Sequence, residues 1–305
     1  MKVRVFLWIR DNLRSLKDSN QKLYDQFKRE LTQNFKVMVS IEAVETVRLI
    51  DDEFNSNHKM LIESLFNAHE EKLKYIEAML NVKEQVIQDT IREYSLQSAN
   101  PQEAKKYIEF MKMHLRLCCQ LKKKEEVLAM IEEKSKQGYQ PNEEYLMICL
   151  EFKQTEACGL LNKKLGKYYE SVQMYLNSIT ENLNIKKLMY ELYEGKKGKL
   201  DMEYPIKNEK LRPNATKIDH IVVKVLKICK NHYKEVDIGK EEQIWYDVLE
   251  KLYSLKNHEL MWYKKFCREF FDQRINMFIV ELVNHISFQN FYEQFVLKQK
   301  NMKFQ

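Results

Sequence analysis

Apolar side chains recur along this chain at the three- and four-residue intervals that place them on one side of an α-helix. The clearest pattern lies between Glu143 and Leu183. Its first part carries apolar positions at Ala157, Leu160, Leu161 and Leu165, and its second part carries Val172, Tyr175, Leu176, Ile179 and Leu183. Gly166 lies between them, and glycine readily adopts the left-handed conformation that ends a helix. We therefore predict a helical hairpin that turns at Gly166, with Ala157 and Gly159 small enough to admit a neighbouring helix.

Similar stripes predict further helices before this hairpin. Residues 13–53 are expected to form two short helices, and residues 57–94 either one long helix or several, with bends near residues 67–69 or at Asn81. Asn100 followed by Pro101 and Glu103 is typical of a capped helix start. That helix is predicted to turn near residues 122–124 and to pack on a partner that ends at Gly138. Residues 140–142 then open the hairpin described above.

After the hairpin, the segment from Gly195 to Lys217 holds two of the six glycines and two of the four prolines. Such residues are typical of loops, so we predict a basic linker here. Four helices are expected to follow: 218–233, 241–255, 259–271 and 274–289. The predicted domain organisation is a helical-repeat segment at 1–182, the linker at 183–217 and a C-terminal helical segment at 218–305.

The fold class follows from these patterns together with the scarcity of turn residues. Only 6 Gly and 4 Pro occur in 305 residues, whereas sheets need frequent turns. One hairpin cannot bury its apolar sides alone, so it requires stacked neighbours. Two hairpins in tandem, about forty residues apart, match the repeat lengths of such arrays. We predict an all-α fold, an α-solenoid of antiparallel helical hairpins.

Charge and cysteine content bear on the compartment. Between Leu183 and Lys240 there are 14 Lys or Arg against 8 Asp or Glu, which accounts for the whole net charge of +6. Six cysteines without CxxC spacing favour a reduced, intracellular protein with buried thiols. The N-terminal apolar segment, Val5 to Ile9, is too short for a signal peptide, and no stretch has the eighteen uncharged residues of a membrane span. We expect a soluble, cytosolic protein.

One helix has a lysine-rich side that consists of Lys224, Lys227, Lys230 and Lys234. It lies opposite the apolar positions Ile221, Val222, Val225 and Cys229. This side is either an anion-facing surface for phosphoinositide headgroups or an acidic partner, or simply the solvated side of an ordinary helix. The solvated side is the interpretation we favour.

No pattern in the sequence indicates catalysis or metal binding. His114 and Cys118 are four residues apart, but no second pair of ligands follows. The acidic segment at residues 51–53 is most simply a charged helix end. No serine–histidine, cysteine–histidine or paired-carboxylate motif is present. We therefore expect no catalytic residue, no metal site and no cofactor.

The segment from Thr155 to Leu183, TEACGLLNKKLGKYYESVQMYLNSITENL, resembles the clathrin-heavy-chain-type repeats in the large vacuolar sorting subunits of the CORVET and HOPS tethering complexes. The shared features are an alanine-bearing helix, a double leucine, a basic dipeptide, a glycine turn and an aliphatic helix. Among those subunits it is most similar to the CORVET-specific, Rab-binding type, in which a helix resembling Glu241 to Leu255 follows after a linker. The convincing part of the resemblance covers about thirty residues.

The resemblance implies a non-enzymatic scaffold arm of an endosomal or vacuolar tethering complex. Its implied partners are other subunits and a Rab GTPase, and its implied location is cytoplasmic, peripheral on endosomal or vacuolar membranes. The RING and the β-propeller of such subunits have no counterpart in this sequence, so we expect a fragment, a truncated form or a divergent relative.

Two alternatives remain open. A helical-repeat scaffold of another assembly, such as a coat, ciliary or cytoskeletal component, would show the same hairpins. The segment from Met130 to Cys149 also resembles the junction between pentatricopeptide repeats, which would indicate an RNA-binding array. No second copy follows at thirty-five residues, and the charge outside the linker is balanced. We therefore expect no nucleic-acid partner.

Overall fold

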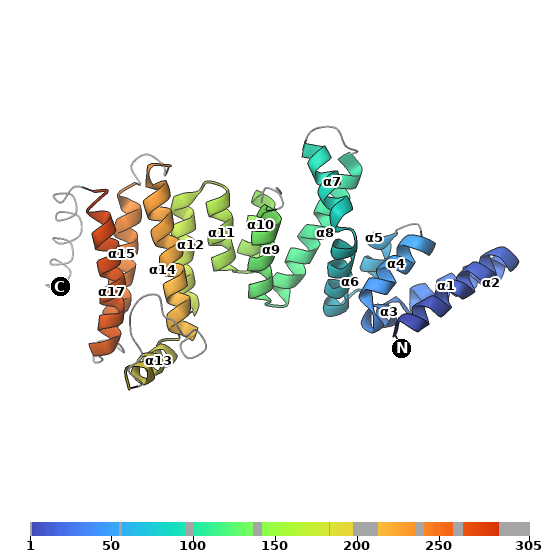
Figure 1. Ribbon diagram of the computed structural model, residues 1–305, viewed down its shortest axis with the longest axis horizontal. Coiled ribbons are helices and arrows are strands. Elements are labelled where there is room, and N and C mark those ends of the chain that lie inside the picture. Colours follow the sequence, from blue (N-terminus) through green and yellow to red (C-terminus); the bar gives the residue numbers. More distant parts are fainter. Residues whose placement is uncertain are drawn as a thin grey trace. The chain divides into compact units, whose positions relative to one another are not determined.

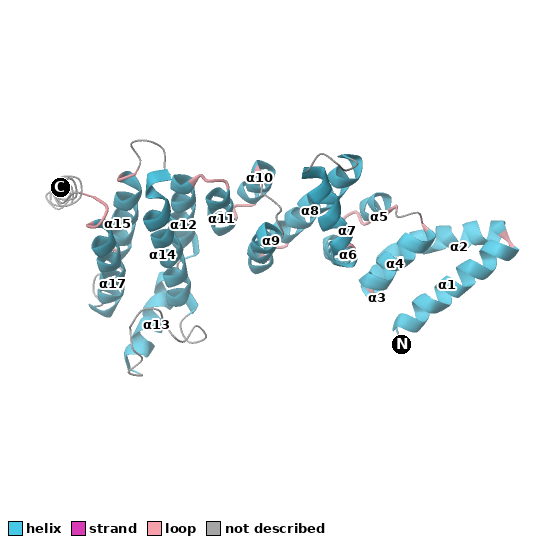
Figure 2. Ribbon diagram, turned by 45° about the horizontal axis from the view of Figure 1, so that its top comes forward, coloured by secondary structure: helices cyan, strands magenta, loops and turns pink. Residues whose placement is uncertain are grey.

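The computed structural model of the chain describes residues 2–54, 57–95, 101–136, 142–182, 184–197, 213–235, 241–258 and 265–286. Of these residues 87% are helical and none lies in a strand, which confirms the all-α prediction. The chain forms two compact units, unit 1 (Met1–Gln140) and unit 2 (Pro141–Gln305). In both units helices that are adjacent in sequence pack against one another, as expected for a helical array (Figures 1 and 2).

Unit 1 contains the helices α1 (Lys2–Ser19), α2 (Gln21–Gln33), α3 (Phe35–Ile41), α4 (Ala43–Glu53), α5 (His58–Ser64), α6 (His69–Val82), α7 (Glu84–Ser95), α8 (Pro101–Gln120) and α9 (Lys124–Lys136). Helix α1 packs on α2 and α4, α4 on α6, and α6 on α8. Helix α8 also packs on α7 and α9. Each helix thus buries its apolar side against its neighbours.

The beginning of the chain holds more helices than we predicted. Residues 13–53 were expected to form two helices, whereas the structure has four helices between residues 2 and 53. Phe6, Ile9 and Leu13 are buried along α1, so the short N-terminal apolar segment belongs to an amphipathic helix. Asn20 caps α2, because its side chain accepts a hydrogen bond from the Leu23 amide at 3.1 Å. These helices end without glycine or proline, which is why the sequence did not reveal their boundaries.

The bends considered for residues 57–94 are present, so the interpretation as one long helix is wrong. Helix α5 is followed by Asn67 in the left-handed region (φ 64°) before α6 begins. Lys83 then separates α6 from α7. The predicted turn at residues 122–124 is confirmed between α8 and α9. The expected Asn100 cap of α8 lies outside the described residues.

Unit 2 contains α10 (Glu143–Glu151), α11 (Thr155–Lys164), α12 (Tyr168–Asn182), α13 (Ile185–Lys197), α14 (Pro213–His232), the 3-10 helix η1 (Tyr233–Glu235), α15 (Gln243–Lys256) and α17 (Lys265–Leu282). Helices α12, α14, α15 and α17 lie side by side, and α13 lies at one end of them (Figure 1).

The hairpin predicted for residues 143–183 is present only in part. Its turn is confirmed at Gly166, which has φ 75°. The single leading helix is wrong, however, because α10 ends and α11 begins on either side of Lys153, which is itself left-handed at φ 52°. The Gln154 amide donates to the Cys149 carbonyl at 2.8 Å, which closes α10 as a glycine C-cap would. A lysine at this position gave no sequence signal for a helix end.

Two other predictions after the hairpin need correction. The predicted linker includes helical residues, since α13 extends to Lys197 and α14 begins at Pro213. Glu191 of α13 caps α14: its carboxylate accepts hydrogen bonds from the Asn214 and Ala215 amides at 3.0 and 3.2 Å. The predicted break between residues 271 and 274 is also absent, because α17 runs through it.

One large core joins the helices of unit 2. Its fully buried residues include Val172, Tyr175, Leu188, Ile221, Val225, Ile244, Trp245, Leu249, Phe271 and Phe278. The apolar stripes predicted for α12 and α14 are therefore confirmed. Helix α12, which the predicted organisation assigns to residues 1–182, shares this core with helices of the predicted segment 218–305.

Candidate functional site

The lysine-rich side predicted from the sequence lies on and just after α14. Lys224, Lys227 and Lys230 belong to α14, and Lys234 belongs to η1. Lys227, Lys230 and Lys234 are exposed, whereas Lys224 is half-buried. The structure thus places the four lysines over one broad side of the helix, opposite its buried residues.

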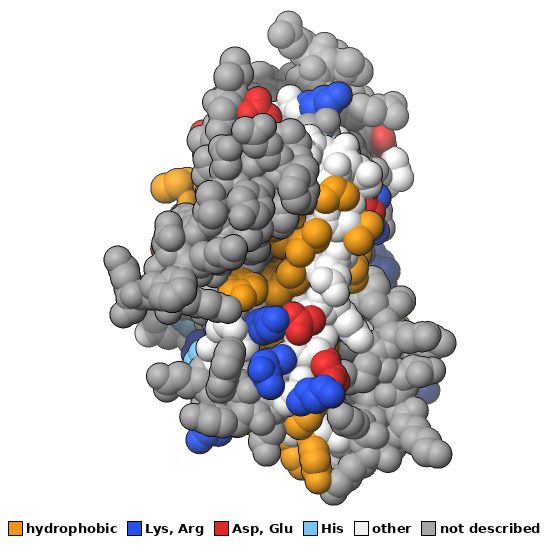
Figure 3. All heavy atoms as spheres, turned by 90° about the vertical axis from the view of Figure 1, so that its left-hand side faces the viewer, with side chains coloured by type: hydrophobic (Ala, Val, Ile, Leu, Met, Phe, Trp, Pro, Cys, Tyr) orange, Lys and Arg blue, Asp and Glu red, His pale blue; other side chains and the backbone are white. Residues whose placement is uncertain are grey.

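Two of these lysines have acidic partners on neighbouring helices. The Lys224 ammonium lies 3.0 Å from the Glu156 carboxylate of α11, and the Lys230 ammonium lies 2.8 Å from the Glu281 carboxylate of α17. Figure 3, seen from the α17 side, likewise shows acidic and basic side chains next to one another. Charges that alternate in this way attract anions less than an uninterrupted basic surface does. The anion-facing interpretation stays a prediction, and these ion pairs weaken it.

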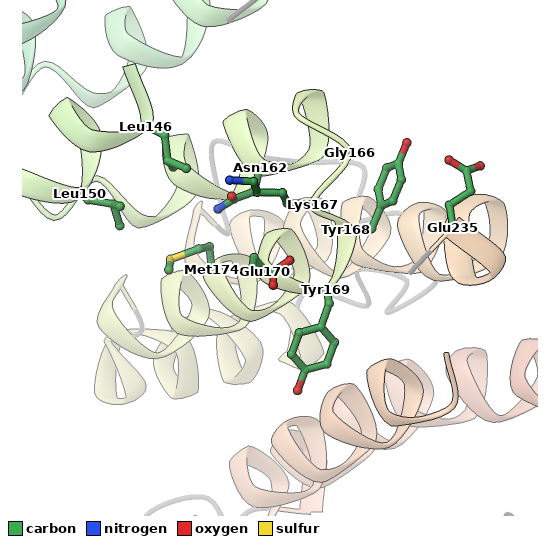
Figure 4. A pocket seen from close by; sticks show the side chains of 10 residues that line it. All are labelled: Leu146, Leu150, Asn162, Gly166, Lys167, Tyr168, Tyr169, Glu170, Met174 and Glu235. Carbon is green, nitrogen blue, oxygen red and sulfur yellow. The ribbon is translucent and has the colours of Figure 1, made fainter. Parts of the chain in front are cut away.

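A groove on unit 2 is a concave feature that the described residues form. It has a volume of about 510 Å³ and is lined by Leu146, Leu150, Asn162, Gly166, Lys167, Tyr168, Tyr169, Glu170, Met174 and Glu235 (Figure 4). Helix α10 supplies one side of the groove and α12 the other. The end of α11 and the turn at Gly166 connect the two sides. Sequence analysis missed this groove because its residues come from four separate elements.

Packing between α11 and α12 holds one side of the groove in place. Gly159 of α11 lies against the Tyr175 ring of α12, so closely that an added Cβ would be 3.0 Å from the ring. Beside it the buried Ser171 hydroxyl donates a hydrogen bond to the Gly159 carbonyl at 2.6 Å. This contact confirms the prediction that Gly159 admits a neighbouring helix.

Two tyrosines at the start of α12 tie the groove to the rest of unit 2. The Tyr169 hydroxyl donates to the Asp247 carboxylate of α15 at 2.8 Å, and burial with this hydrogen bond raises the pKa of Tyr169 to about 12. Tyr168 stacks on the His232 ring, with the ring centroids 4.1 Å apart. His232 in turn lies 3.1 Å from the Glu235 carboxylate. Burial, then the hydrogen bond to Glu235, raises the pKa of Tyr168.

The charged residues at the groove are unevenly distributed. The Lys167 ammonium lies 2.7 Å from the Glu143 carboxylate, in a pair that is exposed on both sides. Glu170 and Glu235 contribute two further carboxylates. The groove therefore combines apolar side chains with a surplus of negative charge.

Sequence analysis also missed two buried polar networks. In unit 2 the Arg274 guanidinium binds the Asp219 carboxylate through two hydrogen bonds, at 2.6 and 2.8 Å, with both side chains buried. In unit 1 the His58 ring lies 2.7 Å from the Tyr75 hydroxyl and 2.9 Å from the Asp51 carboxylate. An acidic residue on the apolar side of α14, and an arginine among the phenylalanines of α17, were the available signals.

Cysteine and histidine residues do not gather into a metal site in the described part of the chain. The Cys118 sulfur lies 3.8 Å from His114 Nε2, while His114 Nδ1 lies 3.1 Å from the Met130 sulfur. All six cysteines are buried, and none of them is in a disulfide. Burial raises the pKa of Cys118 to about 12, so its thiol stays protonated at neutral pH.

Neither hydropathy nor comparison with known proteins identifies a function for this chain. None of the described helices has the length and hydropathy needed to cross a membrane. No family model matches this chain, and no curated protein or solved structure matches it significantly. The structure by itself therefore shows an all-helical protein, and its function has to be argued from its surfaces.

Proposed function

We propose that this protein is a non-enzymatic scaffold arm that binds other proteins through an α-solenoid of helical hairpins. The observation that carries this proposal is the α11–α12 hairpin, in which the glycine turn and the close contact between Gly159 and Tyr175 match the expected repeat. The succession of helices that pack on their sequence neighbours supports it further. Arrays of this kind present long ridges and grooves to their partners.

Within this role, the resemblance of residues 155–183 favours a subunit of an endosomal or vacuolar tethering complex. Its partners would be other subunits of a CORVET- or HOPS-type complex and a Rab GTPase. The chain would then lie in the cytoplasm and reach endosomal or vacuolar membranes through these partners. A fold alone does not specify a pathway, so the assignment to a tethering complex depends on the resemblance.

Affinity purification of the tagged chain from native cytosol, followed by mass spectrometry, tests the proposal. We expect tethering-complex subunits and a Rab GTPase among the recovered proteins. The variant Leu161→Asp is the matched control, because Leu161 is fully buried in the α11–α12 hairpin and an unpaired charge there disrupts it. Partners that depend on the folded array are expected to be lost with this variant.

Other outcomes would redirect the proposal. Recovery of coat, ciliary or cytoskeletal proteins would retain the scaffold role and reject the tethering complex. A gel-shift titration with mixed single-stranded RNA tests the pentatricopeptide alternative, since RNA binding weakens steeply as salt is added. Submicromolar, salt-sensitive RNA binding without protein partners would reject the scaffold role itself.

A further inference from the structure

We propose that the groove between α10 and α12 binds a short peptide segment of a partner protein, one that carries a bulky apolar side chain beside a Lys or Arg. This inference rests on the proposed function in one respect, that the array binds other proteins. It does not depend on which pathway those proteins belong to. The apolar sides, a buried amide and the surplus of carboxylates each point to such a segment.

The position of the groove in the array makes it accessible to a peptide. Helix α10 packs on α11, and α11 packs on α12, so α10 and α12 border the groove while α11 lies between them. The groove volume of about 510 Å³ is in the range of pockets that hold several side chains. An elongated segment is therefore a better fit than a folded domain.

Apolar side chains on both sides of the groove provide a place for a bulky apolar residue. Leu146 and Leu150, one turn apart on α10, line it opposite Met174 of α12. Leu150 is 41% exposed, so a ligand that covers it would remove apolar area from water. Methionine adapts its shape to different partners, which suits a surface that binds short segments.

Asn162 provides a polar contact inside this apolar groove. Its residue surface is only 3% exposed, and the residue lines the groove. Its carboxamide offers both a donor and an acceptor, which is what a peptide backbone requires. A bound peptide would hydrogen-bond to the amide and so gain specificity for an extended backbone.

The charges at the groove select a basic segment. Glu170 and Glu235 line the groove, and the one lysine there, Lys167, is already paired with Glu143 at 2.7 Å. An anionic ligand such as a phosphate group or RNA would meet these carboxylates and be repelled. A Lys or Arg in the peptide would instead be attracted by them, and this attraction would weaken with salt.

Selection of peptides on the purified full chain tests the inference directly. A phage-displayed library of random twelve-residue peptides is panned on the immobilised protein, and enriched peptides are synthesised with a fluorophore for anisotropy titrations. We expect the enriched sequences to combine Leu, Ile, Phe or Met with Lys or Arg. Absence of enrichment, or an acidic consensus, would overturn the proposal.

Matched variants then locate the binding site. Asn162→Ala removes the amide that lines the groove, so we expect about tenfold weaker peptide binding by a variant that still unfolds cooperatively on heating. Glu170→Lys is expected to weaken binding at least as much and to reduce its salt dependence. Glu181→Lys is the control, because Glu181 is an exposed acid on the same helix that does not line the groove.

Equal binding by the parent and by the Asn162→Ala and Glu170→Lys variants would place the peptide elsewhere and reject the groove. Loss of binding with Glu181→Lys as well as Glu170→Lys would show a general charge effect and would also reject it. The purification from cytosol plays no part in these measurements of peptide binding. The tethering assignment and the peptide groove can therefore fail independently.

Discussion

Gly159 shows how one residue controls the spacing of two helices. Its backbone lies against the ring of Tyr175, which is 1% exposed and enclosed by the core of unit 2. A side chain at position 159 would therefore crowd this buried ring. This close approach also brings the Gly159 carbonyl within reach of the Ser171 hydroxyl.

The substitution Gly159→Ala is expected to destabilise unit 2. Overpacking costs about 1–3 kcal/mol, and the better helix propensity of alanine returns at most about 1 kcal/mol of this. Chemical denaturation measures the difference in the free energy of unfolding. The added variant Tyr175→Leu makes room for the methyl group, so Gly159→Ala should cost less in that background. An equal cost in both backgrounds would contradict the contact.

His58 is a second residue whose surroundings determine its behaviour. Burial lowers the pKa of its ring, and the hydrogen bond to Asp51 offsets this only in part. The Lys83 ammonium, which lies 2.6 Å from the same Asp51 carboxylate, also opposes a charge on the ring. The neutral ring is therefore the form that the folded protein prefers.

This preference predicts a loss of stability in mild acid. In the unfolded chain the histidine pKa is about 6.5, so below that pH the unfolded state binds the proton that the folded state resists. The free energy of unfolding should therefore fall as the pH is lowered from 7.5 to 5.5. Urea titrations across this range measure the effect. His58→Gln should flatten the pH dependence, and an unchanged slope would contradict the assignment to His58.

Helices α14 and α17 are joined by contacts of two very different kinds. The Asp219–Arg274 pair is fully buried, and the Arg274 guanidinium also donates to the Phe270 carbonyl at 2.9 Å and lies 3.7 Å from the Phe270 ring centroid. Burial raises the pKa of Asp219, while Arg274 acts in the opposite direction. The Lys230–Glu281 pair links the same two helices but is partly exposed.

These two pairs give a matched test of burial. Asp219→Asn leaves the Arg274 charge without its counter-ion in the core, and we expect a loss of about 3–5 kcal/mol in the free energy of unfolding. Lys230→Met removes a partly exposed pair and should change it by less than about 1 kcal/mol. Denaturant titrations of both variants measure the contrast. Similar losses would show that Asp219 and Arg274 are not buried as described.

An apolar replacement of both partners refines this prediction. Asp219→Leu combined with Arg274→Met removes both charges and keeps apolar side chains of similar length in the core. The double variant should therefore be more stable than Asp219→Asn alone. A double variant that unfolds as readily as the single one would assign the loss to packing and not to charge.

At the scale of the whole molecule, the described residues are predominantly helical. Sixteen α-helices are present in those residues, and no strand occurs. We expect a far-ultraviolet circular dichroism spectrum with the double minimum of a predominantly helical protein. A strong β signal would contradict the fold, because the apolar stripes that form both cores depend on the helical period. The Leu161→Asp variant should lose its helical signal at a lower temperature than the parent chain.

The amino-acid pattern alone was sufficient for the all-α class and for many buried positions. The stripes on α12 and α14 predicted their core residues, since a helical period of 3.6 leaves one side apolar whatever the neighbours are. The turn at Gly166 was equally predictable, because glycine is the residue that most readily takes a positive φ. These features are local and repeat within a few residues.

Helix ends without glycine were decided by the three-dimensional structure. Lys122 and Lys153 adopt the same left-handed conformation as Gly166. In each case the amide of the next residue donates a hydrogen bond back to the helix that has just ended: Lys123 to the Cys118 carbonyl, and Gln154 to the Cys149 carbonyl. Lysine has no preference for this conformation, so the packing of the flanking helices has to select it. Helix α17 continues through residues 271–274, where the sequence has neither glycine nor proline.

The groove and the buried polar networks depended on tertiary structure entirely. Asn162 acquires its importance only when α10 and α12 enclose it, and His58 acquires its shifted pKa only when Tyr75 and Asp51 surround it. Residues far apart in sequence make these sites, and a periodic pattern carries no information about which of them meet. Local periodicity thus determines where helices form, whereas long-range packing determines which of their polar side chains are buried together.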